Sequence, residues 1–346
     1  MQDSLYINRC LELAALAGSQ TGSNPKVGSV IVAAGKIIGE GYHKKYGGPH
    51  AEIEAFESVP ASKKHLIEGA TMYVSLEPCA HFGKTPPCAD RIIAEKIKKV
   101  VICSKDPNQL VNGSGIQKLK ENRIEVLAGI EGEKGDALIE PFVANLKKIP
   151  YIILKIVESS DGFIGSLSEK IWLSNQFSTT LSHKWRSEVD GIMIGSRTAI
   201  LDNPSLNTRL WPGKNPVRVI WDANLVIPRS NHIYNEVANT IILNKIKDEN
   251  VSENVTLVNV CKYSLKETLE VLFKMGINSI LVEGGTATIR QFIEAGLWNE
   301  GRIITTKVPL QNQGYQELVK ASKIEGKCVN ETFLFGDRLR IVKKKE

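Results

Sequence analysis

The sequence predicts two α/β domains, because short β-branched strands alternate with amphipathic helices along the chain. A length of 346 residues fits two domains. With 42% hydrophobic and 24% charged residues, the composition excludes low-complexity, collagen-like and wholly disordered chains. No apolar stretch approaches the ~20 residues that span a bilayer. The start, MQDSLYINRC, lacks the pattern of a signal peptide, so we expect a cytoplasmic protein.

The net charge and the aromatic content indicate which kind of partner the protein binds. The net charge of +6 mildly favours anionic partners, and a phosphorylated small molecule accounts for it as well as nucleic acid does. Aromatic residues, 6% of the chain, are not interleaved with basic ones as in nucleic-acid-binding surfaces. We therefore expect a small-molecule partner, no nucleic acid and no membrane.

Six cysteines are too few for a disulfide scaffold and predict free thiols or metal ligands. The charge run Lys343–Glu346 predicts a solvated terminus.

The first half begins with a helix and a pair of strands. Asp3–Ala17 carries apolar residues at helical spacing and ends at Gly18, which predicts a helix closed by a glycine. Val27–Ala33 predicts a strand, and Gly35 allows a tight turn into a second strand, Ile37–Tyr42. The later elements that we predict in this half are a helix at Ala51–Ser58, a strand at Met72–Leu76, a helix at Cys88–Lys98, strands at Val100–Ser104 and Ile124–Leu127, and a helix at Ala137–Lys148.

Pro150 follows the last of these helices and marks the domain boundary, since helices usually end before a proline. We therefore expect domains at 1–148 and 149–346. The second opens with an uninterrupted apolar strand, of the kind that is buried on both faces. The strands that we predict there are Tyr151–Val157, Gly191–Ile194, Val217–Trp221, Thr240–Leu243, Ser279–Val282 and Arg302–Thr306, with helices between several of them.

The strongest chemical signal lies between His50 and Cys88. His50 starts a helix, Cys79 follows a strand, and Cys88 opens another helix. One histidine and two cysteines form a three-ligand set for Zn²⁺ that leaves a fourth position for water. Glu52 lies two residues from His50 and can sit beside the metal without binding it. Zinc nucleobase deaminases share this layout, in which zinc acidifies a water molecule and a glutamate that is not a ligand moves protons.

Two observations leave alternatives open. Eight residues separate Cys79 from Cys88, instead of the two in the usual deaminase pattern, although a loop of this length closes readily onto one ion. A closed structural zinc site would need a fourth ligand, for which His43 or His81 is available. A zinc-stabilised binding protein without catalysis is therefore an alternative, as is a deaminase that edits nucleic acid.

The motifs NPKVG at Asn24–Gly28, PHAE at Pro49–Glu52 and SLEPCAHFGKTPPC at Ser75–Cys88 occur in order and are followed by DPN at Asp106–Asn108. Together they resemble the bifunctional deaminase/reductase family of riboflavin biosynthesis, whose cysteine spacing is the same. The resemblance covers essentially the whole chain. It implies a cytidine-deaminase-like domain followed by a dihydrofolate-reductase-like domain.

This resemblance implies a substrate and two reactions. The substrate would be 2,5-diamino-6-(5-phosphoribosylamino)pyrimidin-4(3H)-one, which is deaminated with Zn²⁺ and then reduced at its ribosyl group by NADPH. His50, Cys79 and Cys88 would hold the metal, and Glu52 would be catalytic. The deaminase substrate would contact Asn24, His43, Lys84 and Thr85.

In the second half the resemblance is carried by SSDG at Ser159–Gly162, GSRTAILDNPSLNTR at Gly195–Arg209 and VEGG at Val282–Gly285. A glycine pair between a strand and a helix lets backbone N–H groups approach a diphosphate. The implied substrate contacts of the reductase are Lys170, Arg186, Leu206, Arg209 and Glu283. The implied cofactor contacts are Val157, Trp172, Thr198, Asp202, Ala223, Gly285, Thr286, Ala287, Thr288, Ile289, Arg290 and Gln291.

Five residues depart from this family's usual pattern, namely Val157, Glu158, Lys170, Asn203 and Ala223, and the loop before Trp172 is one residue short. They leave open an enzyme that only deaminates, with a C-terminal domain that binds a phosphoribosyl ligand without reducing it. No G-x-G-x-x-G fingerprint is present, so a standard dinucleotide-binding domain is not indicated. Because homo-oligomers are common among such proteins, we expect one here.

Overall fold

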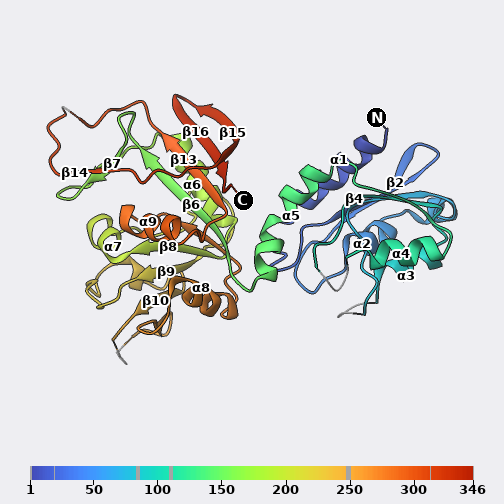
Figure 1. The fold of residues 1–346 in the computed structure, drawn as a ribbon, viewed down its shortest axis with the longest axis horizontal. Coiled ribbons are helices and arrows are strands. Elements are labelled where there is room, and N and C mark those ends of the chain that lie inside the picture. The colour runs from blue at the N-terminus through green and yellow to red at the C-terminus, as the bar shows by residue number, and fades with distance from the viewer. Residues whose placement is uncertain are drawn as a thin grey trace. The chain divides into compact units, whose positions relative to one another are not determined.

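A computed structural model describes residues 2–18, 20–82, 86–108, 112–246, 251–311 and 313–345. The chain divides into two compact units, Met1–Lys147 and Lys148–Glu346. Each has its own sheet and its own core (Figure 1). Within the described ranges, no helix is long and apolar enough to cross a membrane.

The N-terminal unit is built on a five-stranded sheet, counted over the described residues, in the order β2-β1-β3-β4-β5. β1 pairs antiparallel with β2 and β3, whereas β3, β4 and β5 run parallel. Its strands are β1 (Gly28–Ala33), β2 (Lys36–Tyr42), β3 (Thr71–Leu76), β4 (Lys99–Ser104) and β5 (Glu125–Ala128). Its helices are α1 (Gln2–Ala15), α2 (Ala51–Glu57), α3 (Cys88–Ala94), α4 (Ser114–Glu121), α5 (Gly132–Leu146) and a 3₁₀ helix, η1 (Ala61–Leu66).

Strand alternation divides this core between the two faces of the sheet. In β1, Val30 and Val32 pack with α1, while Ile31 packs with α2, α3 and α4 on the other face. Figure 1 shows α1 and α5 on one side of the sheet and α2, α3 and α4 on the other. Because β3 and β4 run parallel, the loops that follow them leave the sheet at the same edge.

The C-terminal unit contains a nine-stranded sheet among its described residues, in the order β11-β10-β9-β8-β12-β6-β13-β16-β15. It is parallel from β11 to β13 and ends in an antiparallel hairpin. Its strands are β6 (Tyr151–Glu158), β8 (Gly191–Gly195), β9 (Val217–Trp221), β10 (Thr240–Asn244), β11 (Val255–Asn259), β12 (Ser279–Val282), β13 (Glu300–Thr305), β15 (Lys327–Leu334) and β16 (Asp337–Lys343).

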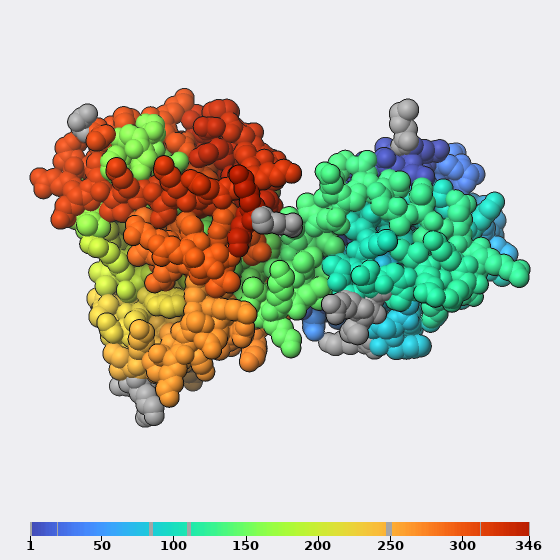
Figure 2. All heavy atoms as spheres, viewed as in Figure 1, coloured from blue at the N-terminus to red at the C-terminus, as the bar shows by residue number. Residues whose placement is uncertain are grey.

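Helices cover both faces of this sheet. Helices α8 and α9 pack on one face, and α7 packs on the other. The helices are α6 (Gln176–Ser187), α7 (Ser196–Asp202), α8 (Leu265–Lys274), α9 (Thr286–Glu294) and the 3₁₀ helix η2 (His232–Tyr234). A separate two-stranded sheet joins β7 (Phe163–Ser166) to β14 (Leu318–Lys320). In Figure 2, the light-green surface at the upper left belongs to the part of the chain that contains β7. The orange-red surface of the late part of the chain borders it.

Several boundaries differ from the sequence-based predictions. The helix expected at Cys88–Lys98 ends at Ala94, because Lys96 adopts a left-handed φ of 56° and turns the chain into β4. The helix expected at Ala137–Lys148 begins earlier, at Gly132, and ends at Leu146. Helix α4 and the β15–β16 hairpin were not predicted. Because β15 is almost wholly exposed, it lacks the half-buried alternation by which a strand is recognised in a sequence.

The expectation of a solvated charge run at the C-terminus was wrong for its first residue, whereas Lys344 is exposed. Lys343 belongs to β16, and its Nζ lies 2.8 Å from Glu300 Oε2 and 2.6 Å from the Tyr151 hydroxyl. Lys344 donates a hydrogen bond to the Gly296 carbonyl. A buried carboxylate is stabilised by a cation, and Lys343 supplies one to Glu300.

Close packing of α2 on β2 depends on glycine. A Cβ on Gly41 would lie 2.3 Å from Ala55 N and 2.6 Å from Ala51 O, well inside van der Waals contact. Helix α2 can therefore lie directly on the strand, and this packing fixes the start of α2, where His50 and Glu52 are found.

We predict that Gly41→Ala destabilises the N-terminal unit by about 1–3 kcal/mol, the usual cost of overpacking. Gly132→Ala is the matched control, because its nearest heavy atom to an added Cβ, Cys103 O, is 3.8 Å away. Calorimetric melting of both variants measures the difference. Equal melting temperatures in the two variants would contradict this account of the α2–β2 contact.

Candidate active sites

The first site lies at the start of α2. His50 Nδ1 is 3.6 Å from Cys79 Sγ and 3.3 Å from Cys88 Sγ, and their ligand atoms lie within 4.8 Å of one another. Zinc bonds of about 2.0–2.3 Å at tetrahedral angles would separate nitrogen and sulfur ligands by roughly 3.6 Å. The three side chains therefore fit one zinc ion. Within the described residues, this is the cluster of His, Cys, Asp or Glu that could hold a metal.

The protonation states suit a metal site. The hydrogen bond from the Cys88 side chain, together with His50 and the Cys88 backbone N–H, lowers the pKa of Cys79 to about 4. That N–H belongs to the first residue of α3 and lies 3.3 Å from Cys79 Sγ. Cys79 is thus a thiolate at neutral pH, which is the form that binds metals.

Glu52 and a neutral histidine face the same cavity. This cavity holds about 290 Å³ and is lined by Asn24, His43, His50, Glu52 and Cys79. Burial raises the pKa of Glu52, so its carboxyl group accepts and releases protons at higher pH than usual. The ring of His43 lies with Nδ1 2.9 Å from Pro49 O and Nε2 3.2 Å from Asn24 Nδ2.

These contacts decide the state of His43. Because Pro49 O can only accept, Nδ1 carries the proton and Nε2 accepts from the Asn24 amide. Burial lowers the pKa of His43, which agrees with a neutral ring. Both ring nitrogens are engaged, so His43 is not a fourth metal ligand here. Lys84 and Thr85, the other two predicted contacts of the deaminase substrate, lie outside the described residues.

Sequence reasoning missed Glu77, which organises this cavity. Its buried carboxylate accepts hydrogen bonds from four backbone N–H groups, at 3.0–3.3 Å, and two of them lie in the first turn of α4. The donors belong to Asp106, Gly113, Gly115 and Ile116. A carboxylate at a helix start is favoured by the helix dipole. Glu77 thereby holds the segment that brings Asp106 and Asn108 to the cavity.

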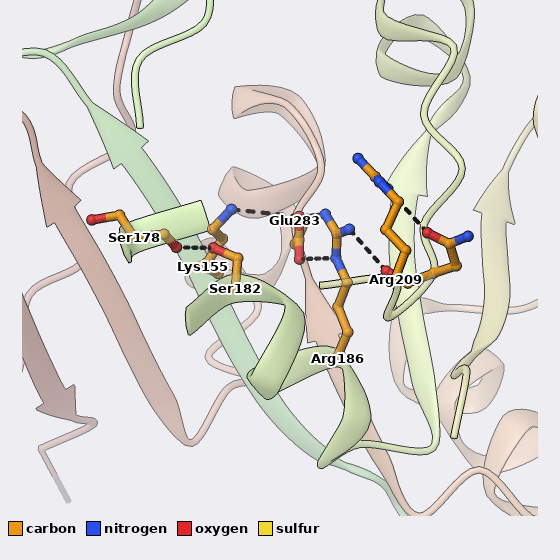
Figure 3. A network of polar contacts seen from close by, with 7 residues as sticks. Lys155, Ser178, Ser182, Arg186, Arg209 and Glu283 are labelled. Carbon is orange, nitrogen blue, oxygen red and sulfur yellow. Dashed lines mark hydrogen bonds and ion pairs between the residues drawn. The ribbon is translucent and has the colours of Figure 1, made fainter. Parts of the chain in front are cut away.

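The second site lies in the C-terminal unit, around the carboxylate of Glu283 just after β12 (Figure 3). Arg186 of α6 binds it through two hydrogen bonds of 2.9 and 2.8 Å, and Lys155 Nζ of β6 lies 3.4 Å away. Burial alone raises the pKa of Glu283, but the charges of Arg186 and Lys155 lower it to about 2. Burial lowers the pKa of Lys155.

A cavity of about 670 Å³ opens beside this network. Most residues predicted for the reductase line it, and so does Lys155, whose place in the site the sequence did not reveal. The predicted residues that line it are Val157, Lys170, Trp172, Arg186, Thr198, Asp202, Leu206, Glu283 and Gly285–Gln291. Arg209 and Ala223 do not line it. Arg209 Nη1 lies 3.0 Å from Asn207 Oδ1, and the Asn207 carbonyl accepts from Arg186.

Two helix N-termini meet at the cavity because glycines allow close packing. A Cβ on Gly284 would lie 3.1 Å from Ile194 Cα, so this turn packs directly on the end of β8. Gly285 N donates to Thr198 Oγ1 at 3.0 Å, which joins the start of α9 to α7. Helix N-termini attract anions, and this arrangement presents two of them.

Residues 1–104 match the family model of the cytidine and deoxycytidylate deaminase zinc-binding region, and residues 150–309 match that of the RibD C-terminal domain. The riboflavin biosynthesis protein RibD of Aquifex aeolicus is 39% identical over 315 residues, covering 89% of this chain and 87% of its own. The chain belongs to the RibD family. RibD of Escherichia coli is 33% identical, with 87% and 86% covered.

Solved RibD structures share the fold. The diaminohydroxyphosphoribosylaminopyrimidine deaminase/5-amino-6-(5-phosphoribosylamino)uracil reductase of Thermotoga maritima has a TM-score of 0.88 and 32% identity, with 99% of each chain covered. RibD of Acinetobacter baumannii has a TM-score of 0.86 and 31% identity, again with 99% of each covered. The predicted resemblance and the two-domain fold, cytidine-deaminase-like and then dihydrofolate-reductase-like, are confirmed. This RibD-family chain is a bifunctional deaminase and reductase of riboflavin biosynthesis.

Three of the departures from the family's pattern, Glu158, Lys170 and Asn203, are accommodated in the RibD fold. Glu158 accepts a hydrogen bond from Thr305 Oγ1 at 2.8 Å and does not line the cavity. Lys170 Nζ donates to the Asp202 carbonyl at 2.8 Å. Asn203 follows α7 with a left-handed φ of 42°, which asparagine tolerates well. Nothing in the comparisons favours an enzyme that has lost its reductase.

We predict that Glu283 makes the stability of the C-terminal unit sensitive to acid. Its pKa is about 2 in the folded state against an ordinary 4.5, so its contribution is complete above pH 4.5 and is lost as the pH falls toward 2. That contribution is roughly 3 kcal/mol. In E283Q, stability at neutral pH should fall by about 3–5 kcal/mol, because two buried cations lose their anion.

All five tryptophans lie in the second unit, so urea unfolding followed by tryptophan fluorescence reports on this unit. Between pH 4.5 and 2, wild-type stability should fall more steeply than that of E283Q. Equal slopes would instead assign the acid sensitivity to other carboxyl groups, such as Asp161, whose pKa hydrogen bonding also lowers to about 2.

Proposed function

We propose that residues 1–148 deaminate 2,5-diamino-6-(5-phosphoribosylamino)pyrimidin-4(3H)-one and that residues 149–346 then reduce the ribosyl group with NADPH. The observation that carries the first step is the three-ligand cluster of His50, Cys79 and Cys88 beside buried Glu52. The reaction named for the T. maritima relative supports the substrate. Deamination adds water at the ring carbon that bears the amine and releases ammonia.

In the deaminase site, a Zn²⁺ ion held by the three ligands would acidify a water molecule and stabilise charge on its oxygen. Glu52 takes one proton of this water and delivers it to the ring nitrogen as the C–O bond forms. It then carries the second proton, from the new hydroxyl group on the ring carbon, to the amine as the C–N bond breaks. Its raised pKa suits this exchange, because the carboxyl group must both accept and donate near neutral pH. Asn24, oriented by neutral His43, offers its amide to the polar edge of the pyrimidine. Lys84 and Thr85 would hold the phosphate.

In the reductase site, NADPH would supply a hydride. The turn at Gly285 and the start of α9, together with Thr198, would hold its diphosphate, since these residues line the cavity and helix N-termini attract anions. Val157, Trp172, Asp202 and Ala223 complete the proposed cofactor contacts. The proposed contacts to the substrate are Lys170, Arg186, Leu206, Arg209 and Glu283.

Reduction adds a hydride to C1′ of the ribosyl group and a proton to the ring oxygen that leaves this carbon. We propose that Lys155 donates this proton. It lines the cavity, and its amine is buried, with a lowered pKa that favours proton release. Glu283 stays ionised and holds the ammonium group at 3.4 Å.

We also propose that the protein works in the cytoplasm as a homo-oligomer. The four cysteines outside the metal cluster, Cys10, Cys103, Cys261 and Cys328, are free thiols, which suits a reducing compartment. Its partner is the small phosphoribosyl pyrimidine, with no nucleic acid or membrane involved.

The proposal predicts separable activities in one chain. Zinc-replete protein given the diaminopyrimidine substrate should release ammonia and then oxidise NADPH. Glu52→Gln should lower ammonia release by at least ~10²-fold, the usual contribution of acid–base catalysis, while it retains zinc and reduces the deaminated intermediate. Ammonia without NADPH oxidation would reject the proposed reductase step. Full ammonia release by the variant would reject the role of Glu52.

For Lys155→Met we expect reductase kcat to fall by about 10²–10⁴-fold with deamination unchanged. Wild-type reduction should decline as the pH rises through the lowered pKa of Lys155, because the neutral amine cannot donate a proton. Lys184→Met is the matched control, since Lys184 of α6 is half exposed and does not line the cavity. If both variants reduce at the same rate, the proton comes from another group.

A further inference from the structure

Arg218, in β9, carries a charge into the core of the C-terminal unit. It is the largest of the fully buried side chains, with an exposed fraction of 0%. No carboxylate of the described residues pairs with it. Its guanidinium instead donates to oxygens of surrounding segments, namely Ser205 O, Ile233 O, Asn235 O, Ala238 O and Asn235 Oδ1. Burying a cation without an anion is costly, which indicates that these contacts have a specific role.

One of these contacts reaches the segment that lines the reductase cavity. Arg218 Nε lies 3.1 Å from Ser205 O. On either side of Ser205 are two non-glycine residues in the left-handed region, Asn203 with φ of 42° and Leu206 with φ of 53°. A leucine in this conformation is strained and persists only where its surroundings hold it.

The strained residue lies at the site itself. Leu206 is buried and lines the cavity, and Pro204 lines it too. The next residue, Asn207, accepts a hydrogen bond from Arg186 Nη1 at 3.2 Å through its carbonyl. Arg186 in turn binds Glu283. The contact at Ser205 therefore lies next to a residue of the cavity wall, Leu206, and close to the carbonyl of Asn207 that binds Arg186.

We infer that Arg218 is a positioning residue of the reductase. By holding the Ser205 carbonyl, it keeps Leu206 in its left-handed conformation against the cavity and the Asn207 carbonyl on Arg186. The remaining four hydrogen bonds anchor the guanidinium to the segment around η2. This inference rests on the proposed reductase site, since it assigns substrate binding to the Leu206 segment.

Arg218→Lys tests this role, because lysine keeps the charge but has three donors on a single atom and cannot span these acceptors. We expect KM for the deaminated substrate to rise about tenfold or more, the factor that one hydrogen bond to a charged group represents. KM for NADPH and ammonia release by the same chain should not change. If the lysine variant does not accumulate as folded protein, R218Q, which keeps two N–H donors, takes its place.

Asn235→Ala is the matched control for stability. It removes a hydrogen-bond acceptor of the same guanidinium, 2.7 Å from Nη2, that belongs to the segment around η2 and not to the segment of Ser205. If Arg218 acts through the Leu206 segment, N235A lowers the melting temperature without changing KM. A purely structural role would instead lower the melting temperature in R218K while KM stays at the wild-type value, and this outcome would overturn the inference.

A double-mutant cycle with Leu206→Gly tests whether Arg218 affects KM through the conformation of Leu206. Glycine adopts the left-handed conformation without strain, so the segment no longer needs the guanidinium. R218K should then raise KM by a much smaller factor in the L206G background than in the wild type. An equal rise in KM in both backgrounds would show that Arg218 does not act through Leu206. Failure of the proposed reductase itself is a different result, because wild-type protein would then not oxidise NADPH with the deaminated substrate.

Discussion

Parallel pairing of strands sends their carboxyl ends to one edge of a sheet, and both sites depend on that constraint. In the N-terminal unit, Glu77 and Cys79 follow β3, and Asp106 follows the adjacent β4. In the C-terminal unit, Thr198 comes soon after β8, and Glu283 comes directly after the neighbouring β12. Residues far apart in the chain are brought together in this way, as is general for open α/β sheets.

Buried charges then hold the segments that leave this edge. Glu77 gathers four backbone N–H groups, Arg218 contacts several backbone carbonyls, and Glu283 binds two cations. Each buried ion would be costly alone, so each strongly favours the one loop arrangement that satisfies it. The charges at the sites thus contribute to specificity of structure as well as to binding.

The two sites use pKa shifts in opposite ways. Burial raises the pKa of Glu52, which suits a carboxyl group that must pick up and release a proton. At Glu283, two neighbouring cations outweigh the same effect and keep the carboxylate ionised, so it can hold Lys155 in place. Burial thus has opposite outcomes at the two carboxyl groups because only Glu283 lies between two cations.

The sequence alone determined the alternating α/β pattern, most strands and the metal cluster. Strand periodicity is a local property, and so is the chemistry of His50, Glu52, Cys79 and Cys88. The spacing of His50 and Glu52 at a helix start can be read from the sequence without knowledge of the tertiary structure. Tertiary structure alone decided the partners of buried charges. Lys155 and Glu283 are separated by 128 residues, and Arg186 and Glu283 by 97. It also decided that Lys343 is a strand residue paired with Glu300, because no local pattern shows which buried carboxylate a distant lysine will meet.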